Sequence, residues 1–233
     1  MSNFAAVVLS AGSGKRMKSD IPKQYMNLNG KPVIYYSLKA FQDCGFSSIV
    51  LVCGKDDVEY CQREIIEKYQ LTGVTAVVPG GRERYHSVFE GLKAVNAADY
   101  VFIHDGARPM LNGDIICRLQ QAVVEESAAV AGMPVKDTIN VVDDASYIKE
   151  VPERKYVWQV QTPQCFSFPI IYEAYNKLVS DEEAGVAIPV VTDDAMVWSY
   201  GNDRRVKMVE ADYRNIKITT PEDLSIAELF LKN

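Results

Sequence analysis

The residues best suited to chemistry lie near the amino terminus, where an apolar run enters a glycine-rich, basic segment. The run is Phe4 to Leu9, and the segment after it reads Ser-Ala-Gly-Ser-Gly-Lys-Arg-Met. Gly12 and Gly14 allow successive N–H groups to turn inward around a polyphosphate, because no Cβ obstructs them. Four cations and one carboxylate give this region a charge of +3 in a chain of net charge −6: Lys15, Arg16, Lys18, Lys23 and Asp20. The sequence therefore predicts a strand that leads into an anion-binding loop.

Two common phosphate-binding motifs do not fit this loop. A P-loop needs a glycine five residues before Gly14 and a hydroxyl after Lys15, but Leu9 and Arg16 stand there. A dinucleotide fingerprint needs a third glycine where Met17 stands. A glycine-rich turn with solvated lysines is the remaining alternative, and the motifs downstream argue against it.

A second group of chemically capable residues follows another apolar run and reads His-Asp-Gly-Ala-Arg-Pro, beginning at His104. In an open α/β sheet, ligands bind at the carboxyl ends of the strands, which is where we expect Asp105. Its carboxylate could hold Mg²⁺, and the planar guanidinium of Arg108 could bind a phosphate. The alternative is an ordinary ion pair between these two side chains. His104 and His86 are the two histidines of the chain, and we expect His104 to be structural.

A third glycine-rich segment, Gly80 to Arg84, comes before Ser87 on an expected helix. Glycine here would let the backbone approach a flat ligand such as a nucleotide base, and the Ser87 hydroxyl could reach a base edge. A strand-to-helix turn with a polar first helical turn explains the same residues equally well.

Apolar runs alternate with helical periodicity along most of the chain. We expect strands at residues 4–9, 47–53, 74–79, 99–104, 128–133, 157–161 and 205–209. Helices are expected from Pro32 to Gly45, at 58–69, at 83–96, around 115–123, and after Ser167, Thr192 and Thr220. Strands that are apolar on both faces and separated by helices predict a doubly wound, mostly parallel α/β sheet of Rossmann-like type.

The alternation breaks at residues 134–156, where strands expected at 135–142 and 147–151, joined by a turn at 143–146, predict a protruding β-hairpin arm. A lone hairpin cannot bury its own faces, so we expect this arm to pack on another subunit. The sequence therefore predicts a single domain over residues 1–233 that forms a homodimer through the arm.

Composition narrows the class of protein further. With 48% hydrophobic and 24% charged residues, the chain is an ordinary globular one. It shows no apolar run of membrane-spanning length and no signal segment, so we expect a cytoplasmic protein without a membrane partner. The five cysteines include no Cys-x-x-Cys pair, so neither a disulfide framework nor a zinc site is indicated. The acidic charge argues against a nucleic-acid partner.

Taken in order, these motifs resemble those of the 2-C-methyl-D-erythritol 4-phosphate cytidylyltransferase family over almost the whole chain. They are AGSGKRM, PKQY, GGRERYHSV, HDGARP, PVKDT, WQVQTPQ, VTDDA and NIKITTPEDL. The resemblance implies that CTP and methylerythritol phosphate react in the presence of Mg²⁺, giving the diphosphocytidyl polyol and pyrophosphate. The substrate phosphate would attack the CTP α-phosphate directly, without a covalent enzyme intermediate.

The resemblance also implies roles for particular residues. The catalytic group would be Arg16, Lys23, Arg154 and Lys217. The nucleotide would contact Ala11, Gly12, Gly14, Lys15, Gly81, Ser87, Asp105 and Gly106, with Asp105 also binding the metal. The polyol phosphate would contact Arg108, Thr138, Arg154, Thr162, Thr192 and Lys217, with the arm residues Thr138 and Arg154 reaching the partner's site.

Several alternatives remain open from the sequence. Thr162 and Thr192 are as consistent with strand-end or helix-capping roles as with substrate contact, and Lys217 is also consistent with a solvated strand lysine. Ribitol 5-phosphate cytidylyltransferases share much of the motif set, and a non-catalytic nucleotide-sensing domain could keep the loop and the Asp105 carboxylate. The chain departs from the common family pattern at Leu9-Ser10, at Gly106 and at Arg214.

Overall fold

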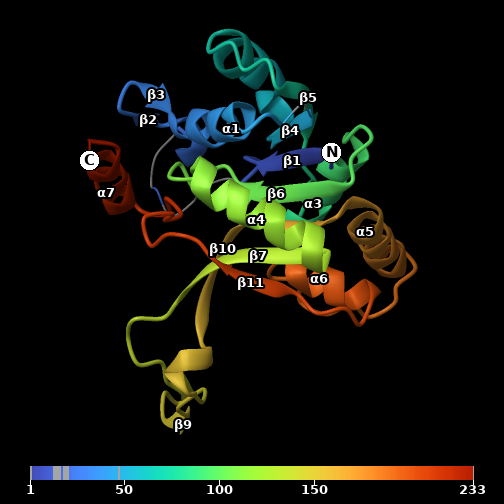
Figure 1. Cartoon of the computed structure of the whole chain (residues 1–233), viewed down its shortest axis with the longest axis vertical. Coiled ribbons are helices and arrows are strands. Elements are labelled where there is room, and N and C mark those ends of the chain that lie inside the picture. Colours follow the sequence, from blue (N-terminus) through green and yellow to red (C-terminus); the bar gives the residue numbers. More distant parts are fainter. Residues whose placement is uncertain (1, 13–16, 18–20, 47, 233) are drawn as a thin grey trace.

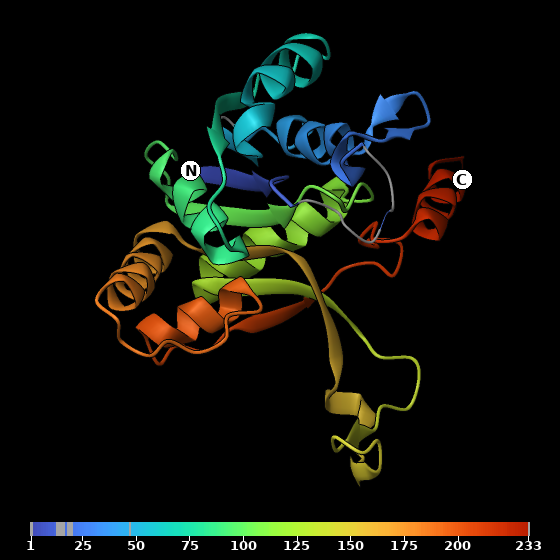
Figure 2. The same cartoon turned by 180° about the vertical axis from the view of Figure 1, so that it is seen from behind.

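The computed structural model describes residues 2–12, 17, 21–46 and 48–232. Its centre is a seven-stranded sheet in the order β11-β7-β10-β6-β1-β4-β5 (Figures 1 and 2). All neighbouring strands run parallel except β10, which is antiparallel to both β6 and β7. The expected doubly wound, mostly parallel sheet is confirmed.

The strands and helices follow the chain order expected from the apolar runs. The strands are β1 (Phe4–Leu9), β2 (Asn27–Leu28), β3 (Lys31–Pro32), β4 (Ser48–Cys53), β5 (Val74–Pro79), β6 (Tyr100–Asp105), β7 (Ala128–Pro134), β8 (Val141–Val142), β9 (Ile148–Glu150), β10 (Trp158–Ser167) and β11 (Lys207–Glu210). The helices are α1 (Val33–Asp43), α2 (Val58–Tyr60), α3 (Arg84–Lys93), α4 (Gly113–Glu126), α5 (Phe168–Glu183), α6 (Asp194–Gly201) and α7 (Pro221–Lys232). No helix in these ranges has the length and apolarity needed to cross a bilayer.

Each face of the sheet is covered by a layer of helices (Figures 1 and 2). On one face α1 and α4 pack against side chains such as Val8 and Phe102. On the other face α3, α5 and α6 pack against side chains such as Val7 and Ile103. Residues alternate between the faces because successive side chains of a strand point to opposite sides, and burial on both sides explains the continuous apolar runs.

The register of the parallel strands brings their carboxyl ends to one edge. Leu9 of β1 lies opposite Val52 of β4 and Asp105 of β6, and Pro79 of β5 lies opposite Cys53. The loops after β1, β5 and β6 therefore leave the sheet side by side. These loops carry the glycine-rich and acidic motifs.

The segment between β7 and β10 projects from the body of the molecule as an arm (Figures 1 and 2). Its two strands β8 and β9 pair antiparallel, and both are exposed. The strand expected at 135–142 is wrong for most of its length, because residues 136–140 form no strand pairing and β8 covers only Val141–Val142. Large apolar side chains are exposed along it: Ile139, Val141, Val142, Tyr147, Ile148 and Tyr156. The arm contributes little to the core of its own chain, and its role in dimerisation stays a prediction.

In the body of the molecule, the structure differs from the sequence prediction in one strand and one helix, and it contains one hairpin that was not predicted. The strand expected at 157–161 runs over Trp158–Ser167, because a register shift between Val160 and Gln164 carries the pairing past Pro163. The helix expected at 58–69 begins as α2 and continues as a π-helix over Cys61–Glu67, with bonds such as Leu71 N–H to the Ile66 carbonyl. The spacing of apolar residues did not distinguish these two helix types, because both place residues four apart on a similar face.

The hairpin of β2 and β3 was missed. Asn29 and Gly30 both have positive φ, at 49° and 84°. Asn-Gly at such a turn is a strong hairpin signal, because both central residues need that backbone conformation. The hairpin packs with Ile218 and Ala227, the latter on α7.

Candidate active site

A cavity of about 480 Å³ opens at the carboxyl edge of the sheet. It is lined by Leu9, Ser10, Ala11, Gly12, Lys23, Gln24, Gly81, Arg82, Glu83, Arg84, Ser87, Asp105, Ala107 and Lys217. Seven of the predicted site residues are thus brought together from separate segments of the chain: Ala11, Gly12, Lys23, Gly81, Ser87, Asp105 and Lys217. A concave site with convergent polar groups is the usual form of a small-molecule site.

Asp105 is surrounded by three cations. Its Oδ2 lies 2.7 Å from Lys217 Nζ and 4.0 Å from Arg108 Nε, and its Oδ1 lies 3.5 Å from Arg84 Nε. Burial alone would raise the pKa of Asp105, but the charges of Arg84, Lys217 and Arg108 outweigh it and hold this pKa well below its ordinary value. The carboxylate is therefore ionised throughout the physiological range, as both a metal ligand and an anchor for cations require.

Arg84 is a residue that the sequence reasoning did not single out. It donates to Asp194 at 2.7 and 2.8 Å, and so joins α3 to α6 as well as approaching Asp105. Tyr175 donates to the same Asp194 carboxylate at 2.5 Å, and Gln164 Oε1 accepts from the Asp194 backbone at 3.0 Å. The sequence did offer a signal for this pair. Arg84 and Asp194 both lie in motifs that the sequence analysis recognised, and a buried charge needs a partner of opposite sign.

The loop after β1 is tied to the following segment by Gln24. Its Nε2 donates to the carbonyls of Ser10 at 2.5 Å and Gly12 at 3.2 Å. The Ser10 hydroxyl donates to the Val52 carbonyl at 3.0 Å. The serine at this position, where the chain departs from the family pattern, therefore anchors the loop to β4. Lys23, next to Gln24, donates to the Ile218 carbonyl at 2.8 Å, which places it beside the segment that carries Lys217.

Thr162 of β10 contacts the backbone of Asp105. Its hydroxyl accepts from the Asp105 N–H at 3.0 Å and lies 3.1 Å from Nδ1 of His104, to which it can donate its own hydrogen. His104 Nε2 lies 3.3 Å from the Arg108 carbonyl. Burial lowers the pKa of His104 to about 3, so the ring is neutral and serves as a structural link, as expected. Thr162 lies inside β10, at its register shift, so the expected strand-end role is wrong, and its hydroxyl instead holds the last residue of β6. Its contact with substrate stays a prediction.

Arg108 and Gly106 are not among the residues that line the cavity. Arg108 donates to the Asn215 carbonyl at 2.7 Å, and its Nε is buried without a hydrogen-bond partner among the described residues. A Cβ at Gly106 would lie 2.9 Å from the Leu9 carbonyl oxygen and would collide with Ile34. The glycine at position 106 is therefore explained by tight packing against Leu9 and Ile34. Direct contact of Gly106 or Arg108 with a ligand stays a prediction.

The other predicted residues lie away from the cavity of their own chain or outside the described residues. Thr138 and Arg154 are exposed on the arm, where Arg154 donates to the Lys136 carbonyl at 3.2 Å. Thr192 is exposed, and Asp193 rather than Thr192 caps α6, since its side chain accepts from the Met196 N–H. Gly14, Lys15 and Arg16 lie outside the described residues, so their predicted roles are not tested.

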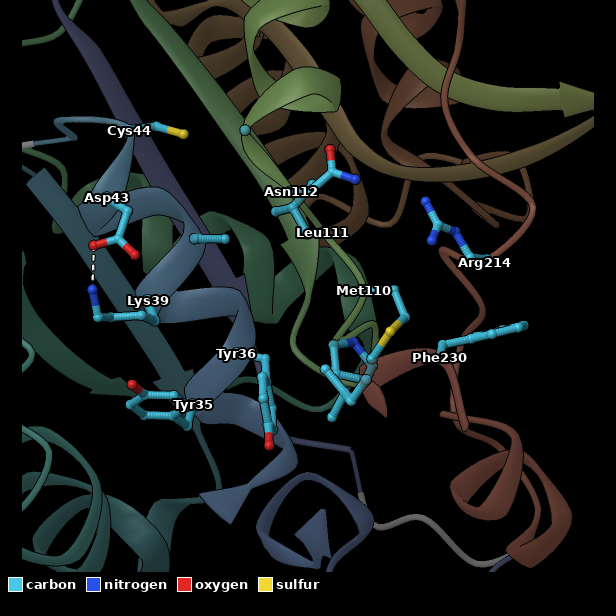
Figure 3. Close-up of a pocket in the computed structure, with 14 residues that line it drawn as sticks. Tyr35, Tyr36, Lys39, Asp43, Cys44, Met110, Leu111, Asn112, Arg214 and Phe230 are labelled. Carbon is cyan, nitrogen blue, oxygen red and sulfur yellow. Dashed lines mark hydrogen bonds and ion pairs between the residues drawn. The ribbon is translucent and has the colours of Figure 1, made fainter. Parts of the chain in front are cut away.

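A second cavity, of about 530 Å³, lies between α1, the segment leading into α4, and the end of α7 (Figure 3). None of the predicted functional residues lines it. Its cations are already neutralised, because Lys39 pairs with Asp43 and Arg214 pairs with Asp212. Arg214, the third departure from the family pattern, lines this cavity and not the one that holds Lys217.

Solved structures with the same architecture define the class. The structure of 4-diphosphocytidyl-2C-methyl-D-erythritol synthase from Anaerococcus prevotii matches with a TM-score of 0.85 and 32% identity, covering 100% of this chain and 99% of that one. The cytidylyltransferase from Thermus thermophilus matches with a TM-score of 0.76 and 26% identity, covering 100% of both chains. The fold is that of the α/β nucleotidyltransferases.

The sequence comparisons identify the family within that class. The family model for 2-C-methyl-D-erythritol 4-phosphate cytidylyltransferase matches residues 4–233. The protein of that name from Lachnospira eligens is 51% identical, over 97% of this chain and 98% of its own length, and the one from Clostridium novyi is 43% identical, over 100% and 98%. The chain belongs to the 2-C-methyl-D-erythritol 4-phosphate cytidylyltransferase family.

Proposed function

We propose that this protein transfers the cytidylyl group of CTP to 2-C-methyl-D-erythritol 4-phosphate, giving 4-diphosphocytidyl-2-C-methyl-D-erythritol and pyrophosphate. The observation that carries the proposal is the cavity in which Lys23, Lys217 and the ionised Asp105 converge beside the glycine-rich loops. Family membership over residues 4–233 supports the choice of both substrates.

The chemistry requires two anions to be held in line. An oxygen of the polyol phosphate attacks the α-phosphorus of CTP, a new P–O bond forms as the bond to the β-phosphate oxygen breaks, and pyrophosphate leaves. Lys23 and Lys217 would reduce the repulsion between the two anions and stabilise the extra negative charge on the five-coordinate phosphorus. Because the attacking group belongs to the substrate, no serine or cysteine nucleophile is needed.

We assign Mg²⁺ to this site through Asp105, as the resemblance implied. Among the described residues no cluster of three or more His, Cys, Asp or Glu side chains could hold a metal. One ionised carboxylate still fits Mg²⁺, because this ion commonly takes its remaining ligands from substrate phosphates and water. When bound, the ion would neutralise the charge that develops on the departing pyrophosphate.

The homodimer is also part of the proposal. Its support is the exposed apolar surface of the arm, together with the position of Thr138 and Arg154 on that arm rather than at their own cavity. An arm that reaches a second subunit would bury this surface and bring Arg154 to the partner's polyol phosphate. The cytoplasmic location stays a prediction from the sequence.

Pyrophosphate release tests the proposed reaction. We expect release from CTP in the presence of Mg²⁺ with methylerythritol 4-phosphate, and slower release with ribitol 5-phosphate. The reverse preference would favour the ribitol alternative. CTP binding without release from either polyol phosphate would favour the sensing domain.

A further inference from the structure

One wall of the cavity consists of the segment from Gly80 to Ser87. Gly81, Arg82, Glu83, Arg84 and Ser87 of this segment all line the cavity. The Ser87 hydroxyl accepts from the Gly81 N–H at 3.1 Å and so closes the turn. A Cβ added at Gly80 would lie 2.6 Å from Ala11 Cβ on the opposite loop. The two loops are therefore so close that a small displacement of this segment changes the width of the site.

Glu182, near the end of α5, binds three side chains of this segment. Its carboxylate accepts from the Tyr85 hydroxyl at 2.8 Å, lies 2.9 Å from His86 Nε2, and forms an ion pair with Arg82. About 100 residues of sequence separate Glu182 from these partners, so only the tertiary fold brings them together. A single carboxylate thus fixes three side chains of the wall.

The position of Glu182 is itself firmly fixed. Tyr175 and Leu178 of α5 are fully buried in the core, and Tyr175 stacks on Phe89 of α3. The Glu182 side chain is only 21% exposed. The Tyr85 hydroxyl, together with the charges of His86 and Arg82, holds the pKa of Glu182 below its ordinary value, so the carboxylate stays ionised.

The contacts of His86 show how much the wall depends on this carboxylate. Nε2 of His86 lies against Glu182, whereas its Nδ1 is buried without a hydrogen-bond partner in the part of the chain that the structure describes. A Cβ added at Gly81 would collide with His86 Cβ, so this side chain packs directly on the backbone of the turn. Moving His86 would therefore move Gly81.

We infer that Glu182 is a positioning residue that sets the affinity of the site for CTP by holding the Gly80–Ser87 wall in place. This inference rests on the proposed function, because it takes CTP as the ligand of that wall. Glu182 touches no reacting atom: it acts through Arg82, Tyr85 and His86. It should therefore affect binding of the nucleotide and leave the chemical step and the polyol phosphate alone.

The test compares Glu182→Gln with Glu183→Gln. Both variants remove one negative charge at the end of α5, but Glu183 is exposed and its side chain has no hydrogen bond or ion pair among the described residues. Losing hydrogen bonds to a charged group should weaken CTP binding about tenfold in Glu182→Gln. We expect KM for CTP to rise equally, with kcat and KM for methylerythritol phosphate within about twofold of wild type. Glu183→Gln should match wild type in all four.

CTP binding is measured by calorimetry without the polyol phosphate, so this result is independent of turnover. Tyr85→Phe should weaken CTP binding less, and its effect should not add fully to that of Glu182→Gln, since both remove the same contact. Unchanged CTP affinity in Glu182→Gln would overturn the inference, as would a loss of thermal stability with kcat lowered and both KM values raised alike. If wild type binds CTP but releases no pyrophosphate, the proposed reaction fails while the calorimetric comparison still decides the role of Glu182.

Discussion

Single side chains around Asp105 determine how charge is distributed in the site. Lys23 and Lys217 come from segments almost 200 residues apart and meet through the Lys23 bond to the Ile218 carbonyl. Replacing either lysine by alanine should reduce kcat by about 10²-fold or more, the scale seen when a preorganised transition-state donor is lost. CTP binding should weaken less. Steady-state kinetics with parallel calorimetry measures both, and near-normal turnover in either variant would remove that lysine from the catalytic group.

Lys39→Ala is the matched control for these lysine variants. Lys39 lines the second cavity and pairs with Asp43, so its loss removes a surface lysine without touching the site (Figure 3). We expect kcat within about twofold of wild type, because surface ion pairs contribute little.

Asp105→Asn tests the metal ligand. The substitution removes the charge that Lys217, Arg84 and Arg108 share, so the free energy of unfolding should fall by about 3 kcal/mol, the scale for a broken buried ion pair. The Mg²⁺ concentration that gives half-maximal pyrophosphate release should also rise steeply. An unchanged metal titration in the folded variant would show that Asp105 does not bind the ion.

His104 predicts a pH dependence of stability. Burial lowers its pKa to about 3 in the folded protein, below the ordinary 6.5, so the unfolded chain takes up this proton first as the pH falls. Stability is fully present above pH 6.5 and is lost below it, by about 2 kcal/mol between pH 6.5 and 4.5 for one such group. In His104→Gln this part of the pH dependence should disappear, whereas His86→Gln should retain it. Denaturant unfolding at a series of pH values measures the difference, and equal slopes in wild type and His104→Gln would contradict the assignment.

At the scale of elements, the approach of α3 to the sheet depends on Gly91. A Cβ there would lie 2.8 Å from Val52 Cγ2 and closer still to Val7 Cγ1. Both valines are β-branched and stiff, so Gly91→Ala should lower the free energy of unfolding by about 1–3 kcal/mol. Alanine has a higher helix propensity than glycine, so a fall in the free energy of unfolding would be due to the packing clash. Glu90→Ala on the same helix should stay within about 0.5 kcal/mol of wild type, and a Gly91→Ala protein as stable as wild type would refute the close approach.

At the scale of the whole molecule, the arm predicts a composite active site. In a mixture of Lys23→Ala and Arg154→Ala subunits, a mixed dimer would have one site with both lesions and one with neither, if Arg154 serves the partner. Random exchange makes about half the dimers mixed, so pyrophosphate release should recover to roughly a quarter of wild type. A confirmed exchange with no recovery would refute the assignment of Arg154 to the partner's site.

Mixing Lys23→Ala with Lys217→Ala is the control for that experiment. Both lysines line the same cavity of one chain, so every site in a mixed dimer would carry one lesion. We expect no recovery, and recovery here would mean that exchange restores activity by some other route.

The sequence by itself determined the elements and the places where chemistry was to be sought. Apolar runs predicted six of the seven sheet strands closely, because burial on both faces leaves a continuous local signal. The rule that parallel strands end at one edge predicted from the sequence alone that Asp105 lies near the loop after β1. The ordered motifs identified the family, which the comparisons confirmed. The exceptions were local as well: the strand that became β10 was predicted too short, and the Asn29-Gly30 hairpin was overlooked.

Only the tertiary structure decided which partner each charged side chain takes. Arg84 could have paired with any nearby acid, and its bond to Asp194 follows from the fold, which brings the first residues of α3 and α6 together. Likewise, the sequence shows Glu182 only as one of several acids at the end of a helix. Its contact with the Gly80–Ser87 wall appears only in the folded structure. The physical reason is that side-chain pairing depends on distances of a few ångströms between distant segments, whereas apolar periodicity records only whether each residue is buried.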